Sequence, residues 1–427
     1  MRTDLTGLAG AADATRAADI ASWLDAAGIA STPAYLYDLA EVRRSYARLC
    51  DALPSPATLY YSLKANPHPD VLATLRALGA WAEVCSRGEL DAAVHAGFAP
   101  GRILYTGPGK RDSDIAAALR AGVRDFSCDS PHALDQLDRL AARHGVEARC
   151  LIRVNDDRPA AGQGLTMTGV ASQFGADASW IEAESERFAS RPNARVAGLH
   201  LYMGSNLADE DALVNQFARA LVTAARLRDA LHADLAVVDL GGGFGAPFAR
   251  AGELPEFPTL NRRLAGLLDE WCPGWRHGRP AIAFESGRYL TATCGRLLTR
   301  VLDTKRSHGR NVLVLESGIN HLGGMSGLRR LPPVTPEFAG CADREPLPDT
   351  LVAGPLCTPL DTWARGVTVP GVRPGDVVVV PNVGAYGLYA SLVTFLGHPL
   401  PAEIAVDGNR VFSVTRLSTQ RIPLRRD

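Results

Sequence analysis

The sequence has few of the features that would place a protein in a membrane or on a nucleic acid. It contains no run of about 18 apolar residues, the length that a membrane-spanning helix requires. Its 45 basic and 46 acidic residues give a formal net charge of −1, which favours neither a nucleic acid nor an anionic membrane as a partner. The start of the chain carries Asp4 and Asp13 and lacks the apolar run of a signal peptide. We therefore expect a cytoplasmic protein.

Cysteine is sparse as well. The eight cysteines are scattered, and no two of them form a CxxC pair. This distribution lacks the spacing of a structural metal site, and in a chain of 427 residues it argues against a disulfide framework. We expect no bound metal.

The first part of the chain alternates between strand and helix patterns. Eight apolar runs of strand length end at Lys64, Cys85, Thr106, Cys128, Val154, Met203, Leu240 and Glu285. Eight such repeats within about 230 residues have the count and size of a closed parallel barrel with helices outside. We predict an α/β fold with a (β/α)₈ TIM barrel over residues 38–290, in which the helix DLAEVRRSYARLCDAL precedes the first strand.

Beyond Leu290 the pattern changes. The short runs GRLLTRVLDT, RNVLVLES, DVVVVP, AEIAVDG and RVFSVT are separated by Gly, Pro or Asp instead of helical segments. Such spacing predicts antiparallel strands. We expect a C-terminal antiparallel β-domain over residues 291–427, to which a strand at about residues 30–37, containing AYLY, is added.

Active sites of TIM barrels lie at the carboxyl ends of the strands, so residues at those ends are candidates for chemistry. Lys64 closes the first run, in YYSLKANP, where a desolvated amine would be a nucleophile for carbonyl groups. A surface lysine with a buried stem is the alternative. Gly241, Gly242 and Gly243 follow the seventh run and would let backbone N–H groups approach an anion, or would simply form a flexible turn.

Glu285 ends the eighth run, and Arg288 follows in ESGRY. The two side chains could form a salt bridge with each other. Alternatively, the carboxylate could pair with the ring nitrogen of a cofactor while the arginine helps to hold a phosphate.

Five motifs together, YYSLKANP, DLGGGFG, ESGRY, GPLCTPLD and GAYG, occur in the order and spacing of the fold-type III decarboxylases that use pyridoxal 5′-phosphate (PLP). From about residue 30 to 415 the chain resembles ornithine and diaminopimelate decarboxylases, which share their barrel with alanine racemases. The resemblance implies PLP as cofactor, decarboxylation of an amino acid, and a homodimer with shared active sites. In such a dimer Cys357 and Asp361 would come from the second subunit. Thr358, Asp361 and His200 are the candidates for contact with the substrate.

The resemblance also implies a role for individual residues. Lys64 would form the aldimine, Glu285 would pair with the pyridine nitrogen and support a quinonoid intermediate, and Cys357 would reprotonate the substrate α-carbon. The remaining cofactor contacts would be Tyr202, Ser205, Gly241, Gly242, Gly243, Gly287, Arg288 and Tyr386. Alanine racemases have an arginine in place of Glu285, which weakens the electron sink and disfavours a racemase here.

The chain departs from the diaminopimelate decarboxylases at several positions. Tyr202 stands where they have a histidine that stacks on the cofactor, and an aromatic ring can still stack there. His200 lies on the same strand face and would be either a residue behind the site or a hydrogen-bonded core histidine. Thr358 replaces the acidic residue that recognises a distal amine, and a hydroxyl does not compensate a buried ammonium group.

These departures argue against lysine, ornithine or diaminopimelate as substrate. GPLCTPLD and GAYGLYASLVTFLGHPLPAEI look closer to the branch of the butirosin-pathway decarboxylase and the exosortase-associated decarboxylases. We therefore expect a decarboxylase of specialised biosynthesis that acts on an amino acid or an aminoacyl group on a carrier protein. Arg329 and Arg330 are candidates for binding an acidic substrate, or form a solvated basic loop. The alternatives are a decarboxylase of primary metabolism, a racemase, a PLP-carrier protein and a catalytically silent homologue.

Overall fold

The computed structural model describes residues 32–157, 168–323 and 344–423. The chain divides into two compact units. Of the described residues, the barrel unit comprises those within 43–246 and 254–290, and the β unit comprises 32–42, 247–253, 291–323 and 344–423. Each unit is described by itself.

The barrel unit is built on eight parallel strands. They are β2 (Thr58–Ser62), β3 (Trp81–Val84), β4 (Ile103–Tyr105), β5 (Asp125–Cys128), β6 (Ala148–Asn155), β8 (Ala194–Leu201), β9 (Val237–Asp239) and β10 (Ala281–Ser286). The order is β5-β4-β3-β2-β10-β9-β8-β6, and pairing of β5 with β6 closes the circle. The predicted (β/α)₈ barrel is thereby confirmed.

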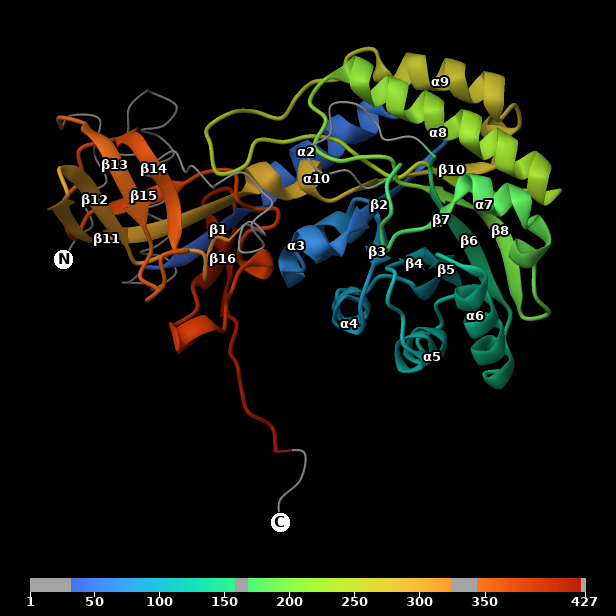
Figure 1. The fold of residues 1–427 in the computed structure, drawn as a ribbon, viewed down its shortest axis with the longest axis horizontal. Coiled ribbons are helices and arrows are strands. Elements are labelled where there is room, and N and C mark those ends of the chain that lie inside the picture. Colours follow the sequence, from blue (N-terminus) through green and yellow to red (C-terminus); the bar gives the residue numbers. More distant parts are fainter. Residues whose placement is uncertain (1–31, 158–167, 324–343, 424–427) are drawn as a thin grey trace. The chain divides into compact units, whose positions relative to one another are not determined.

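Helices follow the strands and lie on the outside of the barrel (Figure 1). They are α3 (Pro69–Ala77), α4 (Arg87–His95), α5 (Asp112–Arg120), α6 (Pro131–Arg143), α7 (Ala178–Ala183), α8 (Glu210–Leu231), α9 (Leu260–Trp271) and the short α10 (Arg288–Thr291). The helix α2 (Leu39–Ala52) precedes β2, as predicted. In α6, Ser130 accepts the N–H of Ala133 and caps the first turn, while Leu134 and Leu137 face the core. None of the described helices has the length and apolar character needed to cross a membrane.

Several strands end earlier than the apolar runs predict. The strand β2 ends at Ser62, so Lys64 lies in a 3₁₀ turn, η1 (Leu63–Ala65). The strand β9 ends at Asp239, which places that carboxylate at the end of the barrel where the active site is expected. A two-residue strand, β7 (Ala176–Asp177), pairs with β6 and was not predicted.

The β unit consists of β1 (Ala34–Asp38), β11 (Gly295–Ser307), β12 (Arg310–Leu315), β13 (Leu347–Ala353), β14 (Thr362–Val369), β15 (Val377–Val380), β16 (Ala402–Asp407) and β17 (Arg410–Arg416). The order is β14-β13-β12-β11-β1-β16-β17, and β15 pairs with β11. The predicted strand near residue 35 is therefore present as β1. The hydrophobic core of the β unit includes Leu36, Leu298, Val379 and Ile404.

Two pairings in the β unit differ from the antiparallel expectation. The strand β1 runs parallel to β16, and β12 runs parallel to β13. The strands β13 and β14 were not recognised, because their mixed polar sequences, LPDTLVA and TWARGVTV, lack a regular alternation and their pairing contains register shifts.

Candidate active site

The carboxyl ends of the barrel strands bring together several of the predicted residues. Lys64 follows β2, His200 lies near the end of β8, and Glu285 lies near the end of β10. Two residues that the sequence did not single out, Glu83 on β3 and Asp239 on β9, join them. Asp239 ends β9 and Glu83 is the last residue but one of β3, so an inspection of the polar residues near every strand end would have found them.

Lys64 pairs with Glu83. The lysine Nζ lies 3.4 Å from the Glu83 carboxylate, which is 2% exposed, while the lysine side chain is 42% exposed. Cys85 and Thr106 also hydrogen-bond to this carboxylate. Burial by itself would raise the pKa of Glu83, but the charge of Lys64 and hydrogen bonds from Ser62, Thr106 and Cys85 lower it to about 2. In this structure the amine is thus ion-paired and partly exposed.

The three consecutive glycines form a tight loop against β8 and β10. A β-carbon at Gly242 would lie 2.2 Å from the carbonyl oxygen of Glu285, and one at Gly241 would lie 2.8 Å from both Leu201 O and Tyr202 Cδ2. Gly241 and Gly243 also have φ values of +64° and +121°, which L side chains rarely adopt. No side chain fits here, so the peptide backbone of the loop is the surface available to a ligand.

Glu285 is part of a buried cluster with His200 and Asp239. The Nε2 atom of His200 lies 3.1 Å from Oε1 of Glu285. The three side chains bring a ligand-type atom each to within 4.8 Å of one another. Burial and the charge of Glu285 raise the pKa of Asp239 to about 7, and the two carboxylates outweigh burial and raise the pKa of His200.

The other predicted residues of the barrel unit flank this loop and cluster. Tyr202 and Ser205 are half-buried and follow β8, and Arg288 is half-buried at the start of α10. A β-carbon at Gly287 would lie 2.7 Å from Ala65 Cβ, next to the turn that carries Lys64. The structure therefore groups these residues with Lys64 and Glu285 at one end of the barrel.

The β unit carries the remaining predicted residues. Cys357 is exposed, Thr358 is half-buried, and both lie in the loop between β13 and β14. Asp361 in the same loop is buried, and its two carboxylate oxygens accept the N–H groups of Ile319 at 2.8 Å and Leu356 at 2.7 Å. These bonds hold the loop that carries Cys357. Tyr386 is half-buried with a φ of +55°. Arg329 and Arg330 lie outside the described residues.

The barrel residues fit the cofactor that the sequence resemblance implies. Glu285 offers a buried carboxylate to a ring nitrogen, the glycine loop offers backbone N–H groups to a phosphate, and Lys64 offers a primary amine. Two buried polar atoms in the same place, Asp239 Oδ2 and Gln216 Oε1, have no hydrogen-bond partner among the described residues, and His200 Nε2 and Glu285 Oε1 have only each other. Because buried polar atoms normally have partners, such a concentration is typical of a binding site.

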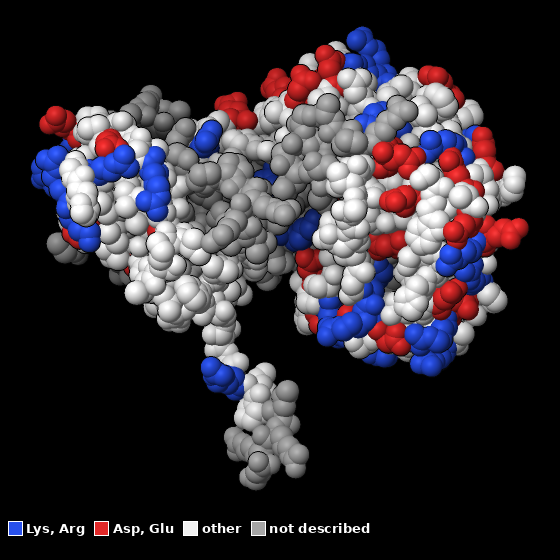
Figure 2. All heavy atoms as spheres, in the orientation of Figure 1, with Lys and Arg blue, Asp and Glu red and all other residues white. Residues whose placement is uncertain are grey.

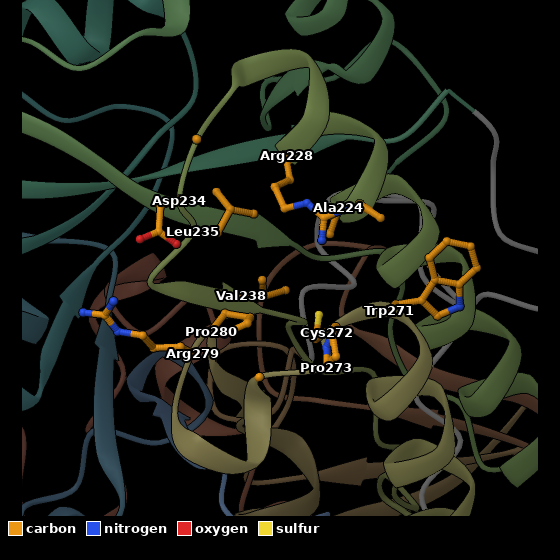
Figure 3. Close-up of a pocket in the computed structure, with 13 residues that line it drawn as sticks. Ala224, Arg228, Asp234, Leu235, Val238, Trp271, Cys272, Pro273, Arg279 and Pro280 are labelled. Carbon is orange, nitrogen blue, oxygen red and sulfur yellow. The ribbon is translucent and has the colours of Figure 1, made fainter.

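A cavity of ≈ 200 Å³ lies elsewhere in the barrel unit (Figure 3). Its lining includes Arg228 of α8, Leu235 and Val238 at the start of β9, and Pro280 before β10. These residues mark the amino-terminal ends of the strands, opposite to the ends that carry Asp239 and Glu285. This cavity is therefore separate from the candidate active site.

Comparisons with known proteins bear on the same residues. A family model described as "Pyridoxal-dependent decarboxylase, pyridoxal binding domain" matches residues 39–292. The chain is 32% identical to L-glutamyl-[BtrI acyl-carrier protein] decarboxylase of Niallia circulans over 378 residues, which cover 87% of this chain and 88% of that protein. It is 29% identical to diaminopimelate decarboxylase of Zymomonas mobilis over 388 residues, 89% of this chain and 88% of that protein.

One solved structure matches most of the chain. The crystal structure of diaminopimelate decarboxylase from Helicobacter pylori, complexed with L-lysine, has a TM-score of 0.78 and 25% sequence identity. The match covers 90% of this chain and 94% of that chain.

Proposed function

The chain belongs to the pyridoxal-dependent decarboxylase family, and from that premise we propose that it decarboxylates an acidic or carrier-bound amino acid in specialised biosynthesis. It is a PLP-dependent amino-acid decarboxylase. The substrate proposal depends on Thr358, and the 32% identity to a decarboxylase of an acyl-carrier-bound glutamyl group supports it.

Thr358 follows directly after Cys357 and has no charge. A substrate with a distal ammonium group needs a carboxylate near that group, because an unpaired charge is costly to remove from water. A hydroxyl supplies a hydrogen bond but no counter-charge. Thr358 therefore favours substrates whose distal end is acidic or neutral.

The residues of the barrel unit would bind and activate the cofactor. PLP, when bound, supplies an aldehyde that condenses with amines and a ring that accepts the electrons left by departing CO₂. Lys64 Nζ would hold the aldehyde, and Glu83 would keep the amine at its place in the barrel mouth. The Glu285 carboxylate would keep the ring nitrogen protonated. The N–H groups of Gly242 and Gly243, with Arg288, would hold the phosphate, while the N–H of Gly241 is donated to Asp239 and fixes the loop.

Cys357 would return a proton to the substrate α-carbon after CO₂ has left. Its loop is held by Asp361 through the N–H groups of Ile319 and Leu356, so Asp361 would position the thiol instead of touching substrate. We further propose that the protein works as a homodimer in which this loop serves the partner subunit's barrel.

A mass-spectrometric screen for CO₂ loss tests the substrate proposal. The PLP-loaded protein is offered free basic, neutral and acidic amino acids, and the same residues as carrier thioesters. Turnover of an acidic or carrier-bound residue is expected, whereas turnover confined to a free diamino acid would overturn the proposal. Lys64→Ala serves as the inactive control in each arm.

A diaminopimelate decarboxylase is the second candidate, because the curated relatives and the solved structure include proteins of that name. Thr358→Asp separates the two. If the substrate is acidic, the new carboxylate should raise KM for it. Thr358→Val, which alters size little and adds no charge, is the matched control. A lower KM for a diamino acid in Thr358→Asp would identify the position as the one that selects the distal group.

A further inference from the structure

The cluster of His200, Asp239 and Glu285 has the composition of a metal site. Three residues from neighbouring strands, β8, β9 and β10, contribute one imidazole and two carboxylates. All three side chains are buried, with exposures of 1%, 0% and 2%. Ligand-type atoms within 4.8 Å of one another can close on a single ion with small side-chain movements.

The three side chains turn polar atoms toward one another inside this cluster. Asp239 Oδ2 has no hydrogen-bond partner among the residues that the structure describes, and His200 Nε2 and Glu285 Oε1 have only each other, 3.1 Å apart. These are one nitrogen and two oxygens, the donor atoms that a divalent transition ion takes from histidine and carboxylates.

The second ring nitrogen of His200 and the second carboxylate oxygen of Asp239 each have a hydrogen-bond partner. His200 Nδ1 lies 2.9 Å from Ser127 Oγ, and Asp239 Oδ1 accepts the N–H of Gly241 at 2.9 Å. Metal-binding histidines and carboxylates commonly have such an outer hydrogen bond, which orients the ligand atom toward the ion. The cluster therefore has both the ligand atoms and the groups that orient them.

We propose that, in the cofactor-free protein, His200, Asp239 and Glu285 form a binding site for a divalent transition ion such as Zn²⁺ or Co²⁺. Two carboxylates neutralise the charge of the ion, and the imidazole favours a transition ion over Mg²⁺ or Ca²⁺, which prefer six or more oxygen ligands. A fourth position would be taken by water from the barrel mouth.

The competition between the ion and the cofactor rests on the proposed function. Glu285 cannot bind the ion and face the ring nitrogen of PLP at once, so occupancy by one excludes the other. The metal site itself does not depend on that proposal, because it needs only the three side chains.

Charged and titratable groups around the cluster affect the ion in opposite ways. Glu83 of β3 adds negative charge, whereas Arg153 of β6 adds positive charge near His200. Tyr60 of β2 faces both carboxylates, and burial raises its pKa well above the ordinary value, so it stays neutral.

Cobalt binding to the full-length protein tests the proposal. Cofactor-free protein, titrated with CoCl₂, should develop visible d–d absorption that saturates at one equivalent. His200→Gln and Asp239→Asn should each abolish the band, while Glu83→Gln, which removes a buried carboxylate outside the cluster, should retain it. Circular dichroism confirms that each variant is folded.

Addition of PLP to the cobalt-loaded protein should remove the band. In the reverse experiment, cobalt at ten times its own Kd or more should weaken the apparent affinity for PLP at least about tenfold. A wild-type protein without a d–d band, or a band that persists in His200→Gln, overturns the metal site. If the band forms but PLP neither binds nor displaces the ion, the metal site stands and the proposed function fails.

Discussion

Lys64 and Glu83 form an ion pair in which the lysine is partly exposed and the glutamate is buried. The two side chains come from successive strand ends, and their charged atoms lie 3.4 Å apart. A buried carboxylate with three further hydrogen-bond donors is a fixed point, and the flexible lysine is the part that can move. Glu83 is thus placed to orient the amine that the proposed function assigns to PLP.

Replacement of Glu83 by Gln should weaken the orientation of Lys64. The amide has a similar shape but no charge, so the lysine amine loses its counter-charge. Cys85 and Thr106 keep a hydrogen-bond acceptor, because the amide of glutamine still has an oxygen. We expect slower covalent attachment of PLP, measured as the rise of the visible absorbance band of the lysine–PLP adduct. Attachment at the wild-type rate would mean that the ion pair plays no part in cofactor loading.

Acid should destabilise the protein through the same carboxylate. The folded-state pKa of Glu83 is about 2, below its ordinary value of 4.5, so the unfolded state binds a proton at higher pH than the folded state does. The stabilising contribution is present above about pH 4.5 and is lost as the pH falls toward 2. Urea unfolding as a function of pH should show a steeper loss in the wild type than in Glu83→Gln.

Gly242→Ala should impair folding and cofactor binding together. The added methyl group would lie 2.2 Å from the carbonyl oxygen of Glu285, so the loop or β10 must shift. The measurements are the melting temperature and the affinity for PLP. Gly266→Ala, in the interior of α9 with nothing within 4 Å, is the matched control and should be neutral or stabilising by about 0.5–1 kcal/mol.

Glu285→Gln should lower the decarboxylation rate by about 10²-fold or more, because an amide does not keep a ring nitrogen protonated as a carboxylate does. The rate of CO₂ release at saturating substrate is the measurement, and PLP content must be equal in the two proteins. A near-normal rate with full PLP content would contradict the pairing of Glu285 with the ring.

A mixture of two inactive variants tests the proposed homodimer. Lys64→Ala lacks the amine and Cys357→Ala lacks the thiol, so a dimer with shared sites has one intact site when the two chains combine. The activity measured is formation of the amine product protonated at the α-carbon. Mixing after mild dissociation should restore part of it, and each variant alone should form little of this product. Without any recovery, although mixed dimers are present by mass spectrometry, the thiol and the amine would belong to the same subunit.

Much of the fold could be predicted from local patterns. Eight apolar runs separated by helical segments predicted a closed barrel, because parallel strands that are buried on both faces have near-continuous apolar sequences. The strands β13 and β14 were missed because they are partly exposed and irregularly paired, so their sequences carry no clear period. Acidic and basic side chains are interspersed on the face of the barrel unit that Figure 2 shows. The ion pair of Arg149 with Asp125 joins the neighbouring strands β6 and β5.

The sequence by itself determined the barrel, the order of its strands and the motifs that carry Lys64, the three glycines and Glu285, because each depends on neighbours along the chain. Only the tertiary structure brought Glu83 to Lys64, and Asp239 to His200 and Glu285. Those contacts depend on strand register and on the closing of the barrel, which place residues from distant segments at one end. The protonation of these carboxylates follows from that burial, and no local pattern encodes it.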